Sequence, residues 1–147
     1  MIYPEQIELG FYVWGETMTS ANLANILYVE DDPDIQTVAQ IALEIVGGFA
    51  LKTCSSGAQA LAEIHSGFVP DLLLLDVMMP NMDGPTTLAE LRKLPTTAAT
   101  PVVFMTAKVQ SSELDFYKSL GAIGVIAKPF DPMELSTQVL KLWQERV

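Results

Sequence analysis

Asp76 is the residue of this chain whose position points most directly to chemistry. It follows an unbroken run of leucines, residues 72–75, and opens the segment DVMMPNMDG (76–84), in which Pro80, Asn81 and Gly84 are typical turn residues. Four consecutive leucines predict a strand that is buried on both faces. An acid placed directly after such a strand lies at the edge of a sheet, where solvent and ligands begin, so Asp76 is a candidate for binding or catalysis.

Polar residues also follow three other predicted strands. The acidic trio Glu30, Asp31 and Asp32 follows the first strand, Thr106 follows the fourth, and Lys128 follows the fifth. Because the carboxyl ends of parallel strands meet at one edge of a sheet, where ligands bind, we expect these side chains to converge on Asp76. Taken singly, each has a plain structural explanation, and Asp32 is expected to be the N-cap of the helix that follows it. Taken together, they predict a polar site.

The predicted site combines acids with a single cation. Glu30, Asp31 and Asp76 would repel one another if all three stayed ionised without positive charge nearby. Lys128 and a divalent ion would supply that charge, and Mg²⁺ fits because proteins commonly hold it with one or two carboxylates plus waters and phosphate oxygens. Asp76 would then attack phosphorus as a nucleophile and form an acyl phosphate. Thr106 and Lys128 would hold the phosphoryl oxygens.

The elements that must position these residues follow from the hydrophobic pattern. From Ala24 onward, short apolar runs alternate with helix-period stretches, which predicts an α/β fold with a parallel sheet covered by helices on both faces. The second strand contains Lys52 and Thr53 and is expected at an edge of the sheet. The predicted strands are 26–29, 50–54, 72–75, 102–105 and 123–127, and the predicted helices run from Asp32 or Pro33 to Gly47, over 56–65, from Gly84 to Pro95, over 112–120, and from Asp131 onward.

Helical spacing also predicts which side chains face the core. In the first and last helices we expect the buried residues to be Ile35, Val38, Ala39, Ala42 and Val46, and Leu135, Val139 and Leu142. Glu134, three residues after Asp131, favours a capped start for the last helix at Asp131.

Composition excludes several classes of function. A chain of 147 residues that is 50% hydrophobic predicts one compact domain, and 18 acids against 8 bases, a net charge of −10, argue against direct binding to nucleic acid. The chain has no basic leader and no apolar run of membrane-spanning length, so we expect a cytoplasmic protein without a membrane partner. Cys54 is the only cysteine and His65 the only histidine, so neither a disulfide nor a zinc cluster is expected, and they are predicted to be a buried thiol and a helix-surface residue.

Residues 24–147 are predicted to form the domain, and residues 1–23 an N-terminal extension that is non-native or flexible. Ile7, Leu9, Phe11 and Val13 alternate in strand fashion, which would let this segment pair with a sheet edge or a neighbouring molecule. Met18 begins a lead-in of the length that a compact domain needs, so the first 17 residues are predicted to lie upstream of the natural start.

The motifs ILYVEDD, LLLLDVMMPNMDG, VVFMTA and GVIAKPF occur in an order and spacing that resemble the receiver domain of bacterial two-component response regulators, especially the single-domain chemotaxis type. The likeness runs from about Asn25 to Val147. It implies a doubly wound, flavodoxin-like fold with a five-stranded parallel sheet in the order 2-1-3-4-5, flanked by five helices. It also implies a cis peptide between Lys128 and Pro129.

The resemblance assigns roles by position. Asp76 corresponds to the phosphoacceptor, while Glu30 and Asp31 correspond to the acidic pair. Asp31, Asp76 and the backbone carbonyl of Met78 would bind Mg²⁺, with Glu30 acting mainly through water. The remaining two positions, Thr106 and Lys128, resemble the switch hydroxyl and the lysine that pairs with the phosphoryl group.

The chain departs from the family pattern in two respects. Val125 stands three residues before the lysine, where the family usually has a switch aromatic, so we expect activation to travel mainly through backbone shifts around Thr106 and the fourth helix. Met78 and Lys108 occupy the places that flank the attacking water, and neither is a suitable general base at neutral pH, which predicts a persistent phosphoaspartate.

The resemblance therefore implies a phosphorylation-activated switch rather than an enzyme. A histidine kinase or phosphotransfer protein would donate the phosphoryl group, and a downstream target protein would read the result, with the chain as a monomer or a phosphorylation-dependent dimer. Because no effector domain follows Val147, the expected output is a protein contact. Two alternatives remain open: a degenerate receiver that acts as a constitutive interaction module, and an aspartyl-phosphate phosphohydrolase.

Overall fold

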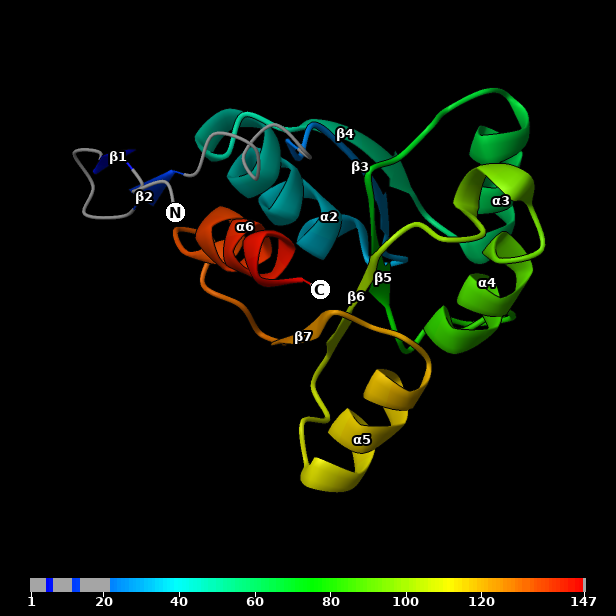
Figure 1. The fold of residues 1–147 in the computed structure, drawn as a ribbon. Helices are drawn as coiled ribbons and strands as arrows, with labels where there is room; N and C mark the ends of the chain where they lie inside the picture. Colours follow the sequence, from blue (N-terminus) through cyan, green and yellow to red (C-terminus); the bar gives the residue numbers. More distant parts are fainter. Residues whose placement is uncertain (1–4, 7–11, 14–21, 147) are drawn as a thin grey trace.

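A five-stranded parallel sheet forms the centre of the molecule in the computed structural model, which describes residues 5–6, 12–13 and 22–146. The strand order is β4-β3-β5-β6-β7, so the predicted order 2-1-3-4-5 and the edge position of the second strand are confirmed (Figure 1). All four neighbouring pairs are parallel. The strands are β3 (Asn25–Val29), β4 (Ala50–Cys54), β5 (Leu72–Asp76), β6 (Val102–Thr106) and β7 (Gly124–Ala127).

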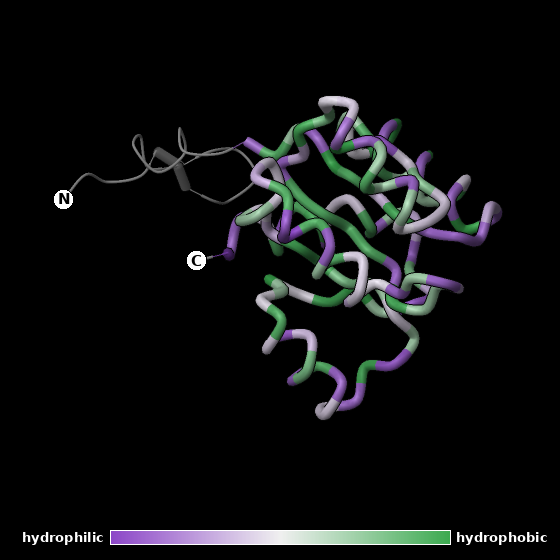
Figure 2. Tube along the Cα trace, turned by 90° about the vertical axis from the view of Figure 1, so that its right-hand side faces the viewer, coloured by the Kyte–Doolittle hydropathy of each residue, from purple (hydrophilic) through white to green (hydrophobic). Residues whose placement is uncertain are grey.

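Helices cover both faces of this sheet, as expected for a doubly wound fold. On one face, α2, η1 and α6 pack against β3 and β5 through a cluster that includes Ala39, Leu43 and Leu135. On the other face, α3 and α4 contribute Ala60, Ile64, Leu88 and Leu91 to a second cluster, which also contains Tyr117 of α5. Figure 2 shows the hydrophobic segments running through the middle of the fold. The bounds are α2 (Pro33–Gln40), the π-helix η1 (Ile41–Val46), α3 (Gly57–His65), α4 (Gly84–Leu91), the 3₁₀ turn η2 (Pro95–Thr97), α5 (Ser111–Ser119) and α6 (Leu135–Glu145).

The first helix differs from its predicted packing. Asp32 is its N-cap, as expected, and accepts hydrogen bonds from the N–H groups of Asp34 and Ile35. The predictions for Val38 and Val46 are wrong, because both side chains are exposed. The helix continues into η1, whose i→i+5 hydrogen bonds give a wider turn than the α-helix that the prediction assumed. The buried residues along α2 and η1 are Ala39, Ala42 and Leu43.

The last helix begins later than predicted. Asp131 accepts the N–H of Met133 on its side chain and the N–H of Glu134 on its carbonyl, so residues 131–134 form a turn and α6 starts at Leu135. The local hydrogen bonds of the aspartate compete successfully with helix formation at this end. Burial of Leu135 and Val139 is confirmed, whereas Leu142 is only partly buried and Trp143 takes the inner position.

The remaining expectations concern single residues and the N-terminal segment. Cys54 is a buried free thiol and His65 is exposed, as predicted. Near the N-terminus, β1 (Glu5–Gln6) and β2 (Tyr12–Val13) pair with each other in a separate antiparallel sheet, while Ile7, Leu9 and Phe11 lie outside the described residues. Within the described part of the chain, no helix is both long and apolar enough to cross a membrane.

Candidate functional site

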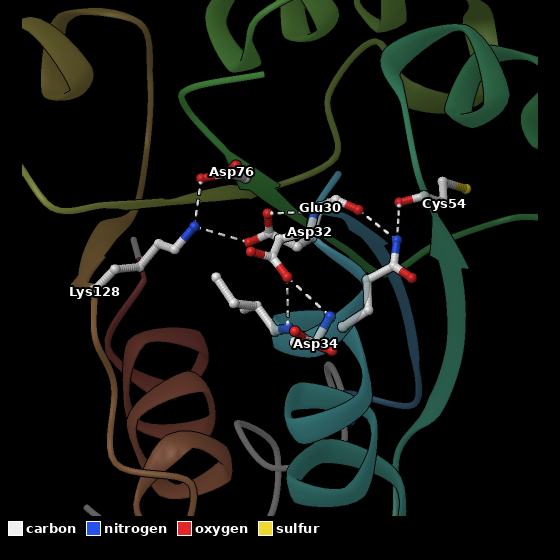
Figure 3. Close-up of polar contacts among 8 residues, drawn as sticks. Glu30, Asp32, Asp34, Cys54, Asp76 and Lys128 are labelled. Atoms are coloured by element: carbon white, nitrogen blue, oxygen red, sulfur yellow. Dashed lines mark hydrogen bonds and ion pairs between the residues drawn. The ribbon is translucent and has the colours of Figure 1, made fainter. Parts of the chain in front are cut away.

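The polar residues predicted to converge do lie together at the carboxyl edge of the sheet. Glu30 follows β3 directly, Asp76 and Thr106 are the last residues of β5 and β6, and Lys128 follows β7. The ammonium group of Lys128 lies 2.8 Å from Glu30 Oε1 and 3.0 Å from Asp76 Oδ1 (Figure 3). Glu30 and Asp76, which lie 98 and 52 positions before Lys128 in the sequence, thus share its positive charge, because the parallel strands end side by side.

Three carboxylates form the acidic part of this site. Glu30, Asp31 and Asp76 each offer an oxygen within 4.8 Å of the others. Glu30 and Asp76 are 1% and 2% exposed, whereas Asp31 faces solvent. Two buried carboxyl groups and one exposed carboxyl group therefore lie close together at this edge of the sheet.

Burial dominates the electrostatics of the two inner carboxyl groups. It raises the pKa of Glu30 to about 7, against the opposing effect of the hydrogen bonds from Lys128 and the Asp32 N–H. It also raises the pKa of Asp76, again against the hydrogen bond and charge of Lys128. Burial alone would lower the pKa of Lys128, but its hydrogen bonds with Glu30 and Asp76 outweigh that effect and leave the pKa above its ordinary value. The site holds more negative charge than one lysine neutralises.

This imbalance predicts that the metal-free protein loses stability as the pH rises from about 4.5 to about 7. In that window folded Glu30 retains a proton that the unfolded chain, with an ordinary pKa of 4.5, has released, so the folded state binds more protons and the free energy of unfolding falls. Urea unfolding at several pH values with a chelator would measure the slope. A Glu30→Gln variant should flatten it, and an unchanged slope in that variant would contradict the assignment.

The residues present fit a divalent cation of the Mg²⁺ type. Asp76 Oδ2 is buried and has no hydrogen-bond partner, although Oδ1 of the same carboxylate is held by Lys128. A buried carboxylate oxygen without a partner is costly, and a cation close to Asp31 and Asp76 would satisfy it. The oxygen-only donor set matches the preference of Mg²⁺. Met78 follows in the loop after β5 with an exposed side chain, and a role for its backbone carbonyl as a ligand stays a prediction.

The loop that carries Asp76 is tightly closed. The N–H of Gly84 donates to the carbonyl of Val77 at 2.9 Å, and Asn81 adopts a positive φ of 68° within the turn. A Cβ atom on Gly84 would come within 2.5 Å of the Asp76 carbonyl oxygen. Glycine at position 84 therefore lets α4 start directly against the backbone of Asp76.

Replacing Gly84 with alanine should displace the Asp76 backbone and slow any reaction at its carboxylate. We expect the free energy of unfolding to fall by about 1–3 kcal/mol, as for overpacking of a well-packed site. Chemical denaturation would measure the loss of stability, and phosphorylation by a small donor would measure the loss of rate. Gly67→Ala tests a loop glycine where an added Cβ has no neighbour within 4 Å, although its positive φ of 108° brings backbone strain of its own. Equal phosphorylation rates for the two variants would contradict the prediction.

Thr106 ends β6, the neighbour of β5 on the side opposite to β3. It is buried, and its hydroxyl oxygen accepts the N–H of Lys108 at 3.1 Å. Its backbone carbonyl accepts the N–H of Lys128 at 2.9 Å, which keeps the ends of β6 and β7 in register, and the peptide between Lys128 and Pro129 is cis, as the resemblance implied. This backbone hydrogen bond therefore places Thr106 and Lys128 next to each other at the site.

Two supporting residues were missed by the sequence analysis. Gln36 donates to the carbonyl of Glu30 and to the hydroxyl of Ser55, and so ties α2 to the loops after β3 and β4. Tyr28 lies two residues before Glu30 and thus on the same side of β3, and its buried hydroxyl has no hydrogen-bond partner. Burial, followed by the charges of Glu30, Asp76 and Asp32, raises its pKa. The two-residue strand period could have placed Tyr28 beside the site.

Comparisons with known proteins point to one protein family. The family model of the response regulator receiver domain matches residues 26–140. The chain is 40% identical over 116 residues to the transcriptional regulatory protein CpxR of Klebsiella pneumoniae, covering 78% of this chain and 47% of CpxR, and 32% identical over 114 residues to a probable transcriptional regulator, ycf27, of Guillardia theta, covering 78% and 43%. The chain thus spans about half the length of the curated relatives it matches.

Solved structures give the same result for the fold. The chemotaxis protein CheY4 of Vibrio cholerae superposes with a TM-score of 0.75 at 26% identity and covers 82% of this chain and 99% of its own. A putative response regulator from Chloroflexus aurantiacus superposes with a TM-score of 0.71 at 30% identity, covering 82% and 98%. Both similarities therefore extend over about four fifths of this chain rather than over the site alone.

Proposed function

The chain belongs to the response regulator receiver domain family of two-component systems, and on that premise we propose that it is a signalling switch that accepts a phosphoryl group on Asp76. The observation that carries the proposal is the Asp76 carboxylate itself. One of its oxygens is held by Lys128, while the other is buried without a partner beside Glu30 and Asp31. This arrangement presents a nucleophilic oxygen next to positive charge.

The transfer breaks the P–N bond of a phosphohistidine on a histidine kinase or phosphotransfer protein and forms a P–O bond to Asp76. Lys128 lies close enough to pair with the incoming phosphoryl oxygens, because it already contacts Asp76 at 3.0 Å. Asp31, Asp76 and the carbonyl of Met78 would hold Mg²⁺, with Glu30 acting through water. When bound, the metal would neutralise charge on the transferred group.

The added charge then shifts the domain between two conformations. Thr106 would turn its hydroxyl toward the phosphoryl group, and backbone shifts around Thr106 and α5 would carry the change outward, since Val125 offers no aromatic ring for the task. A downstream target protein would read the altered surface. The match covers less than half the length of the relatives named as transcriptional regulators, and the net charge of −10 makes direct nucleic-acid binding by these 147 residues unfavourable.

Incubation with acetyl phosphate, with and without Mg²⁺, tests the proposal by intact-mass measurement. A gain of one phosphoryl mass that requires the metal supports it, and no gain would sink it in favour of a constitutive interaction module. Release of many equivalents of phosphate per protein would instead revive the phosphohydrolase alternative. Val77, Met78 and Met79 weigh against that alternative, because none can act as a general acid or base beside Asp76.

The residues at positions 78 and 108 predict that the phosphorylated protein loses its phosphate slowly. Met78 and Lys108 are exposed, and neither side chain can activate a water molecule at neutral pH. Following the decay of the phosphorylated mass after removal of the donor would give the rate. A Met78→Asn variant, which can orient water through its amide, should decay faster, and rapid decay of the unchanged protein would contradict the prediction.

A further inference from the structure

Helix α5 buries a single side chain in the core of the domain. Tyr117 is the buried residue among Ser111–Ser119, all of which the structure describes, whereas α4 and α6 each bury four residues. Figure 1 shows α5 standing apart from the other helices. Its N-cap residue, Gln110, makes no side-chain capping hydrogen bond, so the first turn of α5 lacks the usual support.

Aromatic contacts connect this anchor to the strand that ends in Thr106. The rings of Tyr117 and Phe104 lie 5.3 Å apart between centroids, a distance typical of attractive ring pairs. Phe104 precedes Thr106 by two residues, so both project from the same side of β6. The ring of Phe116, a residue that is 50% exposed, lies 5.6 Å from the ring of Tyr117 between centroids. On the neighbouring strand β7, Val125 is the register partner of Phe104. Tyr117 therefore lies between the buried strand and the outer surface.

The loop that leads into α5 is held by Thr106. Its hydroxyl oxygen accepts the N–H of Lys108 at 3.1 Å, a local bond that ties residues 107–110 to the end of β6. A hydroxyl that turns toward a phosphoryl group on Asp76 gives up this contact. The Lys108 N–H then loses its acceptor immediately before the end of α5 that has no side-chain cap.

We propose that Tyr117 serves as the pivot of the switch in place of the aromatic that the family has at position 125. In the unphosphorylated protein, the Thr106–Lys108 bond and the Tyr117–Phe104 contact hold α5 at two points. Phosphorylation releases the first point and leaves the second, so the first turn of α5 moves about Tyr117 and changes the exposed surface that carries Phe116. The inference rests on the proposed function and names the regulation of that same site.

Hydrogen exchange measured by mass spectrometry tests the pivot in protein treated with acetyl phosphate and Mg²⁺, with the extent of phosphorylation followed by intact mass. Amides of residues 107–115 should exchange about fivefold faster after phosphorylation, the effect of losing one hydrogen bond, while residues 116–121 stay unchanged. Tyr117→Leu should speed exchange along the whole of α5 by about tenfold in both states. Tyr117→Phe keeps the ring and should behave as the unchanged protein, as should the exposed control Leu114→Ala.

The outcomes separate this inference from the proposed function. If the protein gains no phosphoryl mass, the proposed function fails. If it gains the mass but residues 107–115 exchange equally in both states, or Tyr117→Leu matches Leu114→Ala, the pivot is overturned and the phosphoacceptor remains. Loss of the phosphorylation-dependent change in Tyr117→Phe also overturns a pivot based on the ring. Circular dichroism checks that Tyr117→Leu is folded. If this variant does not fold, hydrogen exchange in the phosphorylated and unphosphorylated forms of the unchanged protein still tests the pivot.

Discussion

An Asp76→Asn variant is expected to take up no phosphoryl group from acetyl phosphate under conditions that phosphorylate the unchanged protein. The carboxamide has the same shape but lacks the anionic oxygen that attacks phosphorus. Intact-mass measurement should show one added phosphoryl group on the unchanged protein and none on the variant. Incorporation at the same level in Asp76→Asn would place the acceptor elsewhere.

Loss of folding does not explain this expected result. Burial raises the pKa of Asp76, so the charged carboxylate is a cost to the metal-free fold, and a neutral amide removes that cost. We therefore expect Asp76→Asn to be as stable as the unchanged protein or more stable by denaturant unfolding without metal. Asp34→Asn serves as the matched control, because Asp34 is an exposed acid at the start of α2 outside the carboxylate cluster, and it should phosphorylate normally.

Lys128→Met is expected to lower the free energy of unfolding by about 3 kcal/mol at neutral pH, because it leaves two buried carboxyl groups without their shared cation. The loss should shrink toward pH 5, since burial raises the pKa of Glu30 to about 7 and raises that of Asp76, and protonation removes the uncompensated charge. Phosphorylation should also slow by on the order of 100-fold, because the cation no longer offsets the charge of the incoming group.

Lys93→Met provides the contrast. Lys93 pairs with Glu90 at 2.8 Å on the surface of the domain and its side chain is 69% exposed, so removing its charge should cost less than about 1 kcal/mol. Denaturant unfolding of both variants across a range of pH measures the difference. If the two lysine variants lost the same stability, or if the loss in Lys128→Met did not depend on pH, the shared-cation description of the site would be wrong.

Much of the fold could be predicted because its signals are local. Four leucines before Asp76 and the apolar runs at 26–29 and 102–105 are strands that are buried throughout, and Lys52 correctly indicated the edge strand. The predictions failed where hydrogen bonds departed from the assumed helix. Val46 lies in the π-helix into which the first helix widens and is exposed there, and Val38, which lies within α2, is exposed as well. Helix α6 starts at Leu135 because Asp131 closes a turn instead of capping a helix.

The candidate site was predictable at the level of its members and not of their contacts. Asp76 and Thr106 end their strands, Glu30 and Lys128 follow theirs directly, and the geometry of a parallel sheet is sufficient to bring strand ends together. The supporting hydrogen bonds of Gln36 could not be read in the same way. They depend on how α2 is placed over two loops, which is a property of packing between distant segments.

By itself, the sequence determined the class of the fold, the edge of the sheet at which chemistry can occur, and the acids, hydroxyl and lysine that meet there. These features follow from the alternation of apolar runs and from the residues after each run, which depend only on the order of residues in the chain. Only the tertiary structure decided that Lys128 bridges Glu30 and Asp76, that Asp76 Oδ2 is left without a hydrogen-bond partner, and that Tyr117 is the residue that α5 buries among Ser111–Ser119. These features depend on distances between atoms far apart in the chain and on which side chains lose solvent, and such distances exist only once the strands and helices have packed.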